Sequence, residues 1–253
     1  MDIASKVRIL KIRETLAEEV EDIVAVEKKV RISVNGKHAL SLYCSPQMIR
    51  EFVVGVVFNE GLISGGWCAE RISITYGDEI NVDIPATGTI TEGEKVITSG
   101  CAGGISLNRQ LPEERISDPS VFDLHDIIKL YREFQKRSEG YKATGGVHSA
   151  ALADRKHMLV FTEDIGRHNA VDKVIGYALL EDIPFPGKLM LASGRLSSEI
   201  VLKCGRCGIP VIISRAAPTS LSVDIAESSG VTLIGFARGD RMNIYTGKQR
   251  IRL

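Results

Sequence analysis

The stretch that decides the fold is GGVHSAALADRKHMLVFTEDIGRHNAVDKVIGYALL, residues 145–180. Two apolar runs, 145–152 and 157–162, are separated by a short polar turn, which predicts two strands paired as a hairpin. Over 169–180 apolar residues recur at helical spacing, so a helix should follow the hairpin. The polar residues between the second strand and this helix therefore belong to a strand-to-helix turn.

Strands and helices alternate downstream of this stretch. Apolar runs at 188–193, 210–214 and 231–237 predict three more strands, and helices are expected between them at 196–204 and 220–229. Repeated units of this kind predict a largely parallel sheet with helices on both faces.

The elements at the two ends of this region are also readable. A helix opening at Pro119 is expected upstream because five apolar residues share one helical face: Leu124, Ile127, Ile128, Tyr131 and Phe134. The final stretch, 239–253, is expected to form a short hairpin. The order of helix, hairpin, then alternating helix and strand is that of a cytidine deaminase-like, three-layer α/β domain.

The N-terminal part has a different pattern. Val and Ile recur through 22–43 around an Asn-Gly pair, the preferred two-residue hairpin turn. Ser45 is expected to cap a helix, and a second hairpin and a short strand are expected over 71–84 and 94–98. These features predict a smaller, β-rich α+β domain.

A polar stretch at 108–120 with two prolines is the expected boundary. We therefore expect a β-rich α+β domain over 1–117 and an α/β domain over 118–253. At 253 residues and 44% hydrophobic content, the chain can bury a core in each.

The composition indicates which classes of partner and which compartment to expect. Lys plus Arg and Asp plus Glu both number 32, so no overall charge attracts nucleic acid or membrane, and neither is expected as a partner. No apolar run reaches membrane-spanning length, and the first 20 residues carry charges where a secretory signal has an apolar core. Five unevenly spaced cysteines do not suggest a disulfide scaffold, so a reducing cytoplasm is expected.

Polar residues crowd two strand-to-helix turns, 163–173 and 192–199. Such turns bind ligands in open α/β sheets because the following helix presents unpaired N–H groups. The same residues also fit ordinary structural roles, with Asn169 as a helix cap and Asp164 in an ion pair with Arg167. A third cluster, Phe236–Arg241, begins a tail with five basic residues and one acidic residue, and its arginines suit phosphate oxygens.

Cysteines present two possibilities. Cys101 lies among glycines in SGCAGG, where a thiol is exposed, although a lone loop cysteine can equally be inert. Cys204 and Cys207 form a C-x-x-C that resembles a redox pair or half a zinc site. They fall at a helix end rather than at a helix start, and no further ligands are nearby in sequence, so we expect them to be structural and expect no metal.

A zinc deaminase has to be considered because of the expected fold. Its signature is H-x-E and P-C-x-x-C at two successive helix starts. Here Ala170 stands where the catalytic Glu of a His168-based motif belongs, and the second start offers Ser193 and Gly194 with no cysteine. Deaminase chemistry is therefore not expected, although a degenerate nucleotide-binding module of that fold stays open.

Several motifs together resemble one family. The run EDIGRHNAVDKVIG, with TGGVHSAAL before it and SGRLSSE, GIPV, APTSLSVDIAE and GFARGDRMNIYT after it, resembles the formate dehydrogenase accessory sulfurtransferases, FdhD. The resemblance covers nearly all of 144–246, and VNGKHALSLYCSP, EFVVGVVFNEGLI and TSGCAGG extend it over most of the chain.

The resemblance implies a homodimer that takes persulfide sulfur from a cysteine desulfurase. It passes the sulfur to the bis(molybdopterin guanine dinucleotide) molybdenum cofactor of formate dehydrogenase. It implies that Cys101 carries the sulfur and that Phe236–Arg241 binds the cofactor, with GDP as a fragment ligand. The family's second loop cysteine is replaced by Gly104, so a two-thiol relay in this loop is impossible.

Our hypothesis is persulfide transfer on Cys101, with a non-enzymatic cofactor chaperone as the alternative. The residues expected to bind the cofactor are Phe236, Ala237, Arg238, Gly239, Asp240, Arg241, Gly166, Arg167, His168, Ser193, Gly194 and Arg195.

Overall fold

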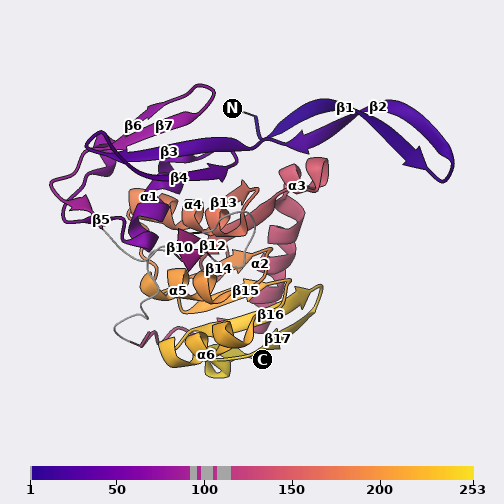
Figure 1. Cartoon of the computed structure of the whole chain (residues 1–253). Helices are drawn as coiled ribbons and strands as arrows, with labels where there is room; N and C mark the ends of the chain where they lie inside the picture. Colours follow the sequence, from indigo (N-terminus) through magenta and orange to yellow (C-terminus); the bar gives the residue numbers. More distant parts are fainter. Residues whose placement is uncertain (1, 92–95, 98–104, 107–114) are drawn as a thin grey trace.

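The computed structural model describes residues 2–91, 96–97, 105–106 and 115–253. Its centre is a six-stranded sheet in the order β13-β12-β14-β15-β16-β17 (Figure 1). The strands are β12 (His148–Ala153), β13 (Met158–Asp164), β14 (Leu189–Ala192), β15 (Val211–Ser214), β16 (Thr232–Arg238) and β17 (Arg241–Ile244). The predicted hairpin is confirmed as β12 and β13, in which His148 pairs with Asp164.

This sheet is mixed, so the prediction of a largely parallel sheet was wrong. Strands β14, β15 and β16 run parallel, whereas β12 pairs antiparallel with both β13 and β14, and β17 pairs antiparallel with β16. The chain leaves β13, crosses over β12 through a helix, and adds β14 on the far side of β12. An apolar run shows where a strand lies but not whether the adjacent strand runs parallel or antiparallel to it. The sequence pattern therefore could not reveal the antiparallel pairs in this sheet.

Helices cover both faces of the sheet and give a three-layer α/β fold. The helices are α2 (Leu124–Arg137) on one face and α4 (Arg167–Leu180), α5 (Ser198–Arg206) and α6 (Ser220–Ser229) on the other. Successive residues of a strand point to opposite faces of the sheet. Leu191 and Ile213 pack in the core that includes α2. Met190 and Ile212 pack in the core that includes α4, α5 and α6. Residues 220–229 form the helix predicted for them, opened by a capping box between Thr219 and Ser222.

Two predictions at the ends of this unit were wrong for one reason. Residues Phe122–Asp123 form β11, which pairs in parallel with β18 (Ile251–Arg252). The helix expected from Pro119 therefore begins only at Leu124, where Asp123 accepts a hydrogen bond from His125 N at 3.0 Å. The expected hairpin over 239–253 does not form, because β17 pairs back with β16 and β18 pairs with β11, after the short helix η2 (Lys248–Arg250).

A smaller sheet in the order β4-β3-β7-β6 lies beside the large unit (Figure 1). Both predicted N-terminal hairpins are confirmed in it, one turning at Asn35 and Gly36 and the other between β6 and β7. Its strands are β3 (Lys28–Val34), β4 (Lys37–Cys44), β6 (Ser73–Thr75) and β7 (Ile80–Ile84). Short elements complete this part and the link to the large sheet: β5 (Ile63–Ser64), η1 (Ala69–Arg71), β8 (Thr89–Ile90), β9 (Val96–Ile97), β10 (Ile105–Ser106) and α3 (Glu139–Thr144). Of the strand expected over 94–98, residues 94, 95 and 98 lie outside the described residues.

Helix α1 (Ile49–Glu60) joins the two sheets, because it packs on the small sheet and also against α4. The helix–helix contact is tight. A Cβ placed on Gly55 would lie 1.9 Å from Asp172 O, and one on Gly176 would lie 1.8 Å from Glu51 O. Only glycine permits this approach, so the two helices cross backbone to backbone.

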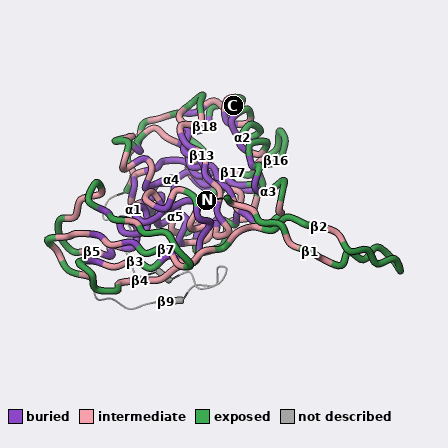
Figure 2. Tube along the Cα trace, turned by 90° about the horizontal axis from the view of Figure 1, so that it is seen from above, coloured by how far each residue is buried: buried purple, intermediate pink, exposed green. Residues whose placement is uncertain are grey.

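Strands β1 (Ala4–Arg13) and β2 (Leu16–Ala25) form a two-stranded arm that the sequence did not predict (Figure 2). It projects from the body, and Leu10, Ile12 and Leu16 are 60%, 67% and 77% exposed. No residue of its two strands is buried, so the arm lacks the core-facing side that most strands have.

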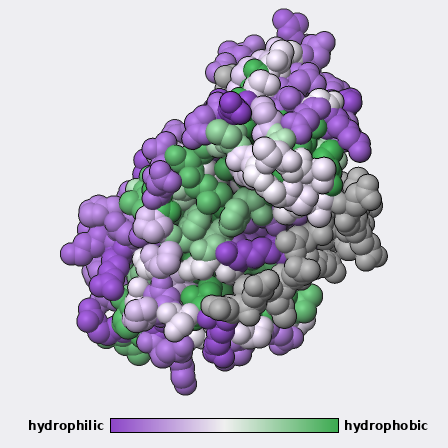
Figure 3. All heavy atoms as spheres, turned by 90° about the vertical axis from the view of Figure 1, so that its left-hand side faces the viewer, coloured by the Kyte–Doolittle hydropathy of each residue, from purple (hydrophilic) through white to green (hydrophobic). Residues whose placement is uncertain are grey.

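None of the helices in the described part of the chain has the length and apolar content needed to cross a bilayer. Apolar side chains do gather on the face shown in Figure 3, where hydrophilic residues border them. Exposed hydrophobic residues are common on protein surfaces and do not by themselves indicate a binding site.

Candidate functional site

The candidate site lies along one edge of the large sheet, which we call the carboxyl edge. It is formed by the C-terminal ends of β13, β14, β15 and β16 and by the start of β12. The strand register sets this, because Ala192 pairs with both Ala150 and Ser214. All three sequence-predicted turns leave strands at this edge, as expected for ligand sites in α/β sheets.

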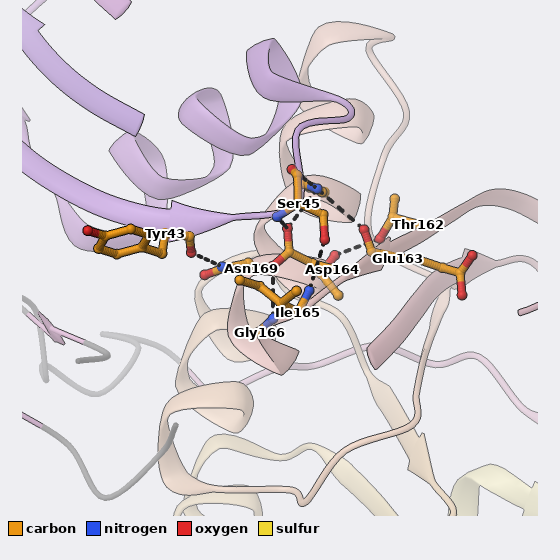
Figure 4. Close-up of polar contacts among 10 residues, drawn as sticks. Tyr43, Ser45, Thr162, Glu163, Asp164, Ile165, Gly166 and Asn169 are labelled. Atoms are coloured by element: carbon orange, nitrogen blue, oxygen red, sulfur yellow. Dashed lines mark hydrogen bonds and ion pairs between the residues drawn. The ribbon is translucent and has the colours of Figure 1, made fainter. Parts of the chain in front are cut away.

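A buried ion pair fixes the first turn to the N-terminal part (Figure 4). Lys173 Nζ lies 2.7 Å from Asp164 Oδ2, and both side chains are fully buried. Lys173 also donates to Ser45 O at 3.0 Å, while Ser45 N donates to Asp164 Oδ2 at 3.0 Å. Buried charges need such partners, so Asp164 serves this junction.

Ser45 therefore does not cap α1, as the sequence suggested. The residue at the cap position is Met48, in a left-handed conformation with φ 53° and no side-chain hydrogen bond. Ser45 Oγ instead accepts from Ile165 N at 3.1 Å, and Asn169 Nδ2 donates to Tyr43 O at 2.9 Å (Figure 4). These bonds hold the start of α4 against the end of β4.

The first two predicted turns touch each other. A Cβ on Gly194 would lie 2.8 Å from the Cβ of Arg167, so glycine is needed for the turn after β14 to pack on this buried arginine. The amide of Gly166 donates to Asp164 Oδ1 at 2.8 Å and is thus engaged within the protein. Arg195 is exposed at the same edge.

His168 lies between the starts of α4 and α5. Its Nε2 is 3.1 Å from Ser197 Oγ and 3.1 Å from Glu199 Oε2. Burial, reinforced by the positive charges of Lys203, Arg167 and others nearby, lowers the pKa of His168 to about 3. The imidazole is therefore neutral at physiological pH and acts as a hydrogen-bonding group.

Ser193 binds the start of β12. Its Oγ accepts from Ser149 N at 2.9 Å and lies 3.3 Å from His148 Nδ1. Burial, and then the charge of Arg167, lower the pKa of His148 below its ordinary value, so this ring is also neutral. Behind these residues lies a cavity of about 300 Å³ that reaches from Phe134 to Arg215.

The third cluster forms the turn between β16 and β17. Arg238 and Arg241 are opposite each other in the register of the two strands, and Gly239 in the turn has φ 63°. Both arginines are exposed and line a depression of about 290 Å³ with Phe236 and Asn243. Asp240 is exposed in the turn as well.

Two features orient this turn. Phe236 has φ 52° and its amide donates to Ala216 O at 3.2 Å, whereas the side chain of Ala237 is buried and cannot reach a ligand. Arg238 Nε is 3.4 Å from Arg215 O, and Arg132 Nε donates to Gly239 O at 3.2 Å. The turn is therefore joined to the end of β15.

Three further residues lie at the same edge although the sequence patterns did not predict them: Arg215, His148 and Tyr141. The signal for Arg215 was present, because Ser214 and Arg215 follow an apolar strand just as Ser193, Gly194 and Arg195 do. His148 and Tyr141 belong to a strand start and a short helix, and no local pattern places them beside the other turns.

The cysteines fall into two groups. Cys44, Cys68, Cys204 and Cys207 are free thiols, and Cys204 and Cys207 lie at the end of α5 as predicted. Cys101 and Gly104 lie outside the described residues. Within those described ranges, no group of three or more His, Cys, Asp or Glu side chains is arranged to hold a metal ion.

Known proteins match this chain over almost its whole length. The FdhD/NarQ family matches residues 25–252. A protein of Geobacillus kaustophilus named sulfur carrier protein FdhD is 36% identical over 242 residues, covering 92% of this chain and 91% of its own. Its namesake in Bacillus subtilis is 35% identical over 244 residues, covering 92% of each chain.

A solved structure agrees with these relatives. It is the crystal structure of a candidate formate dehydrogenase accessory protein from Desulfotalea psychrophila, with a TM-score of 0.83 and 30% identity. The match covers 99% of this chain and 100% of that one. The chain described here belongs to the FdhD/NarQ family.

Proposed function

We propose that this protein is a sulfurtransferase of the carrier type, which serves formate dehydrogenase. It accepts sulfur as a persulfide on Cys101 from a cysteine desulfurase and delivers it to the bis(molybdopterin guanine dinucleotide) molybdenum cofactor. The names of the relatives support sulfur carriage, and the Desulfotalea structure supports the link to formate dehydrogenase.

The observation that carries the proposal is the poor placement of the other thiols. Burial raises the pKa values of the Cys44, Cys204 and Cys207 thiols, so these groups stay protonated and enclosed. Cys68 is partly exposed, but its thiol donates to Glu70 Oε2 at 2.7 Å. Sulfur transfer requires an accessible thiolate, so the placement of these thiols supports the family-based assignment of Cys101 as the carrier.

The loading step is a sulfur exchange without net oxidation. The Cys101 thiolate attacks the terminal sulfur of the desulfurase persulfide, a new S–S bond forms on Cys101, and the desulfurase cysteine leaves as a thiolate. Because residue 104 is glycine, no second thiol of this loop can release the sulfur as a disulfide. Delivery therefore proceeds directly from the persulfide or with a thiol from another protein.

The carboxyl edge is the proposed cargo site. Arg238 and Arg241 would bind phosphate oxygens of the guanine dinucleotide. Ser193 to Arg195 would contribute from the same edge on the other side of β15, and Gly166 to His168 would hold the edge in shape. GDP is the fragment that should bind there. The rest of the Phe236–Arg241 turn, including Ala237, Gly239 and Asp240, would set the spacing of the two arginines.

We infer that the protein works as a homodimer in the cytoplasm, where a reducing environment keeps its thiols free. The free state of the four described cysteines supports that compartment. The alternative function is a chaperone that binds the cofactor without carrying sulfur. The chaperone would bind the cofactor at the same carboxyl edge. The two hypotheses differ in whether Cys101 carries sulfur.

Mass spectrometry of the intact protein tests sulfur carriage. After incubation with a cysteine desulfurase and cysteine, the wild type and Cys68→Ser should gain one sulfur atom that a reducing agent removes. Cys101→Ser should gain none, should bind GDP normally, and should fail to activate formate dehydrogenase. If Cys101→Ser still gains sulfur and still activates its client, the carrier assignment is wrong.

A further inference from the structure

A cavity of about 300 Å³ opens at the carboxyl edge on the side of α2 and α3. On the side of α2 and α3 the lining combines the aromatic rings of Phe134 and Tyr141 with the polar side chains of Gln135 and Ser138, and Val147 adds an apolar side chain just before β12. The sheet contributes polar groups to the lining: Ser149 at the start of β12, Ser193 after β14 and Arg215 after β15. Small-molecule sites combine an apolar wall with a few polar groups in this way, and the volume is at the lower end of their range.

We propose that this cavity takes a flat bicyclic heteroaromatic ring, and that Arg215 binds the phosphate linked to that ring through a sugar or side chain. The inference rests on the proposed function, because it assigns the ring and the first phosphate of the cargo to places at the same edge. It adds Arg215 and Tyr141 to the residues that contact the cargo.

The geometry of the edge connects the cavity with the arginine turn. Arg215 follows β15, the strand between β14 and β16, and its carbonyl accepts from Arg238 Nε at 3.4 Å. Phe236, which lines the neighbouring depression, is bonded through its amide to Ala216. Ring, first phosphate and second phosphate can therefore be arranged in a row from the cavity, past Arg215, to Arg238 and Arg241.

The polar side of the cavity suits a neutral ring with several donors and acceptors. Ser193 Oγ already accepts from Ser149 N, and His148 Nδ1 lies 3.3 Å from the same oxygen. The imidazole of His148 is neutral, since burial lowers its pKa, so it offers one donor and one acceptor instead of a charge. Among the described residues that line the cavity, Arg215 is the one that carries a positive charge.

The rest of the cavity is rigidly built. Glu163 holds the turn between α2 and α3 by accepting from Ser138 Oγ, from Gly140 N at 3.0 Å and from Tyr141 N at 3.2 Å. Ser149 Oγ donates to Ser138 Oγ at 2.9 Å, which ties this turn to β12. Tyr141 itself is 49% exposed, so its ring can be removed without opening the core.

Two parts of the cargo have this chemistry, the guanine nucleotide and the pterin phosphate. Calorimetric titrations of the full-length protein with GDP, neopterin phosphate and pyrophosphate distinguish them. The ligand whose affinity falls in Tyr141→Ala is the one whose ring occupies the cavity. Pyrophosphate lacks a ring and should bind wild type and Tyr141→Ala equally.

Arg215→Ala should weaken every phosphate ligand by about tenfold or more, since it removes a charge-assisted hydrogen bond. Tyr141→Ala should weaken only the ring-bearing ligand, by several-fold, because a stacking surface is lost. Lys136→Ala is the matched control, because Lys136 is an exposed cation of α2 that does not line the cavity, and it should leave all affinities unchanged.

The inference is overturned if Tyr141→Ala and Arg215→Ala bind GDP and neopterin phosphate as the wild type does. It is also overturned if Tyr141→Ala weakens pyrophosphate as much as the ring-bearing ligands. If the wild type binds none of these ligands, the proposed cargo site fails with it. If the ligands bind as expected but Cys101 gains no sulfur, the cavity assignment stands and sulfur carriage fails.

Discussion

Lys203 Nζ lies 2.7 Å from both carboxylate oxygens of Asp172, and this pair joins α5 to α4 inside the protein. Glu60 Oε1 at the end of α1 is 3.0 Å from the same ammonium group. Burial opposes the charge of Lys203, but the two carboxylates overcome it and raise the pKa of Lys203. Three helices thus meet on one cation.

Lys203→Met should therefore destabilise the protein strongly. It removes the cation and leaves two buried carboxylates together, a change that costs about 3–5 kcal/mol in other proteins. Chemical denaturation of the variant and the wild type measures this. Lys142→Met, which breaks an exposed pair with Glu139, is the control and should cost less than about 1 kcal/mol. Equal losses in the two variants would contradict the structural role of Lys203.

Gly176→Ala tests the crossing of α1 and α4. A methyl group at this position would overlap Glu51 O, so the helices must separate, at a cost of about 1–3 kcal/mol or more. Thermal and chemical denaturation should both show the loss. In Gly77→Ala the new Cβ would lie 3.6 Å from Glu79 O, an ordinary contact, and this variant should be much less destabilised.

His168 should remain neutral well below its usual titration range. With a folded pKa of about 3, it binds no proton near pH 5, whereas in the unfolded chain its pKa is near 6.5. The unfolded state thus binds more protons between these values, and His168 makes stability fall as the pH drops from about 6.5 toward 3. An NMR titration should show flat His168 ring shifts from pH 8 to 5.

A substitution checks the same prediction by stability. The free energy of unfolding of His168→Gln should depend less on pH than that of the wild type between pH 6.5 and 4. A normal His168 titration midpoint near 6.5 would contradict the buried, neutral state.

Arg238→Ala and Arg241→Ala should each weaken GDP binding by about tenfold or more, because a charge-assisted hydrogen bond contributes roughly 1.5–3 kcal/mol. Calorimetry measures this directly. Arg155→Ala removes an exposed cation from the hairpin turn between β12 and β13, at the opposite end of these strands, and should have no effect. Unchanged affinity in both turn variants would remove Phe236–Arg241 from the cargo site.

Much of the fold could be predicted because the signals are local. The Asn35-Gly36 turn, the helix over 220–229 and the hairpin of β12 and β13 each depend on a few neighbouring residues. What failed depends on contacts between distant residues. Ser45 looks like a helix cap until Asp164, 119 positions away, is placed beside it.

The candidate site shows the same division. The turns at Gly166, Gly194 and Arg238 could be found because each follows an apolar strand. Their order along the edge could not, because it depends on β14 being added beyond β12. Arg215 also follows an apolar strand, but its place between the turns after β14 and β16 depends on the strand order.

The backbone contact between α1 and α4 also constrains how the chain folds. Helix α1 ends at residue 60, but the surface that Gly55 presents is covered only by α4, residues 167–180. During translation, one side of α1 stays uncovered until more than a hundred further residues have been synthesised and α4 is available to pack against it. Contacts so distant in sequence slow folding and leave apolar surface open to aggregation in the meantime. Truncation before α4 should thus yield an insoluble fragment, and chaperone dependence during expression is the expected cost of this topology.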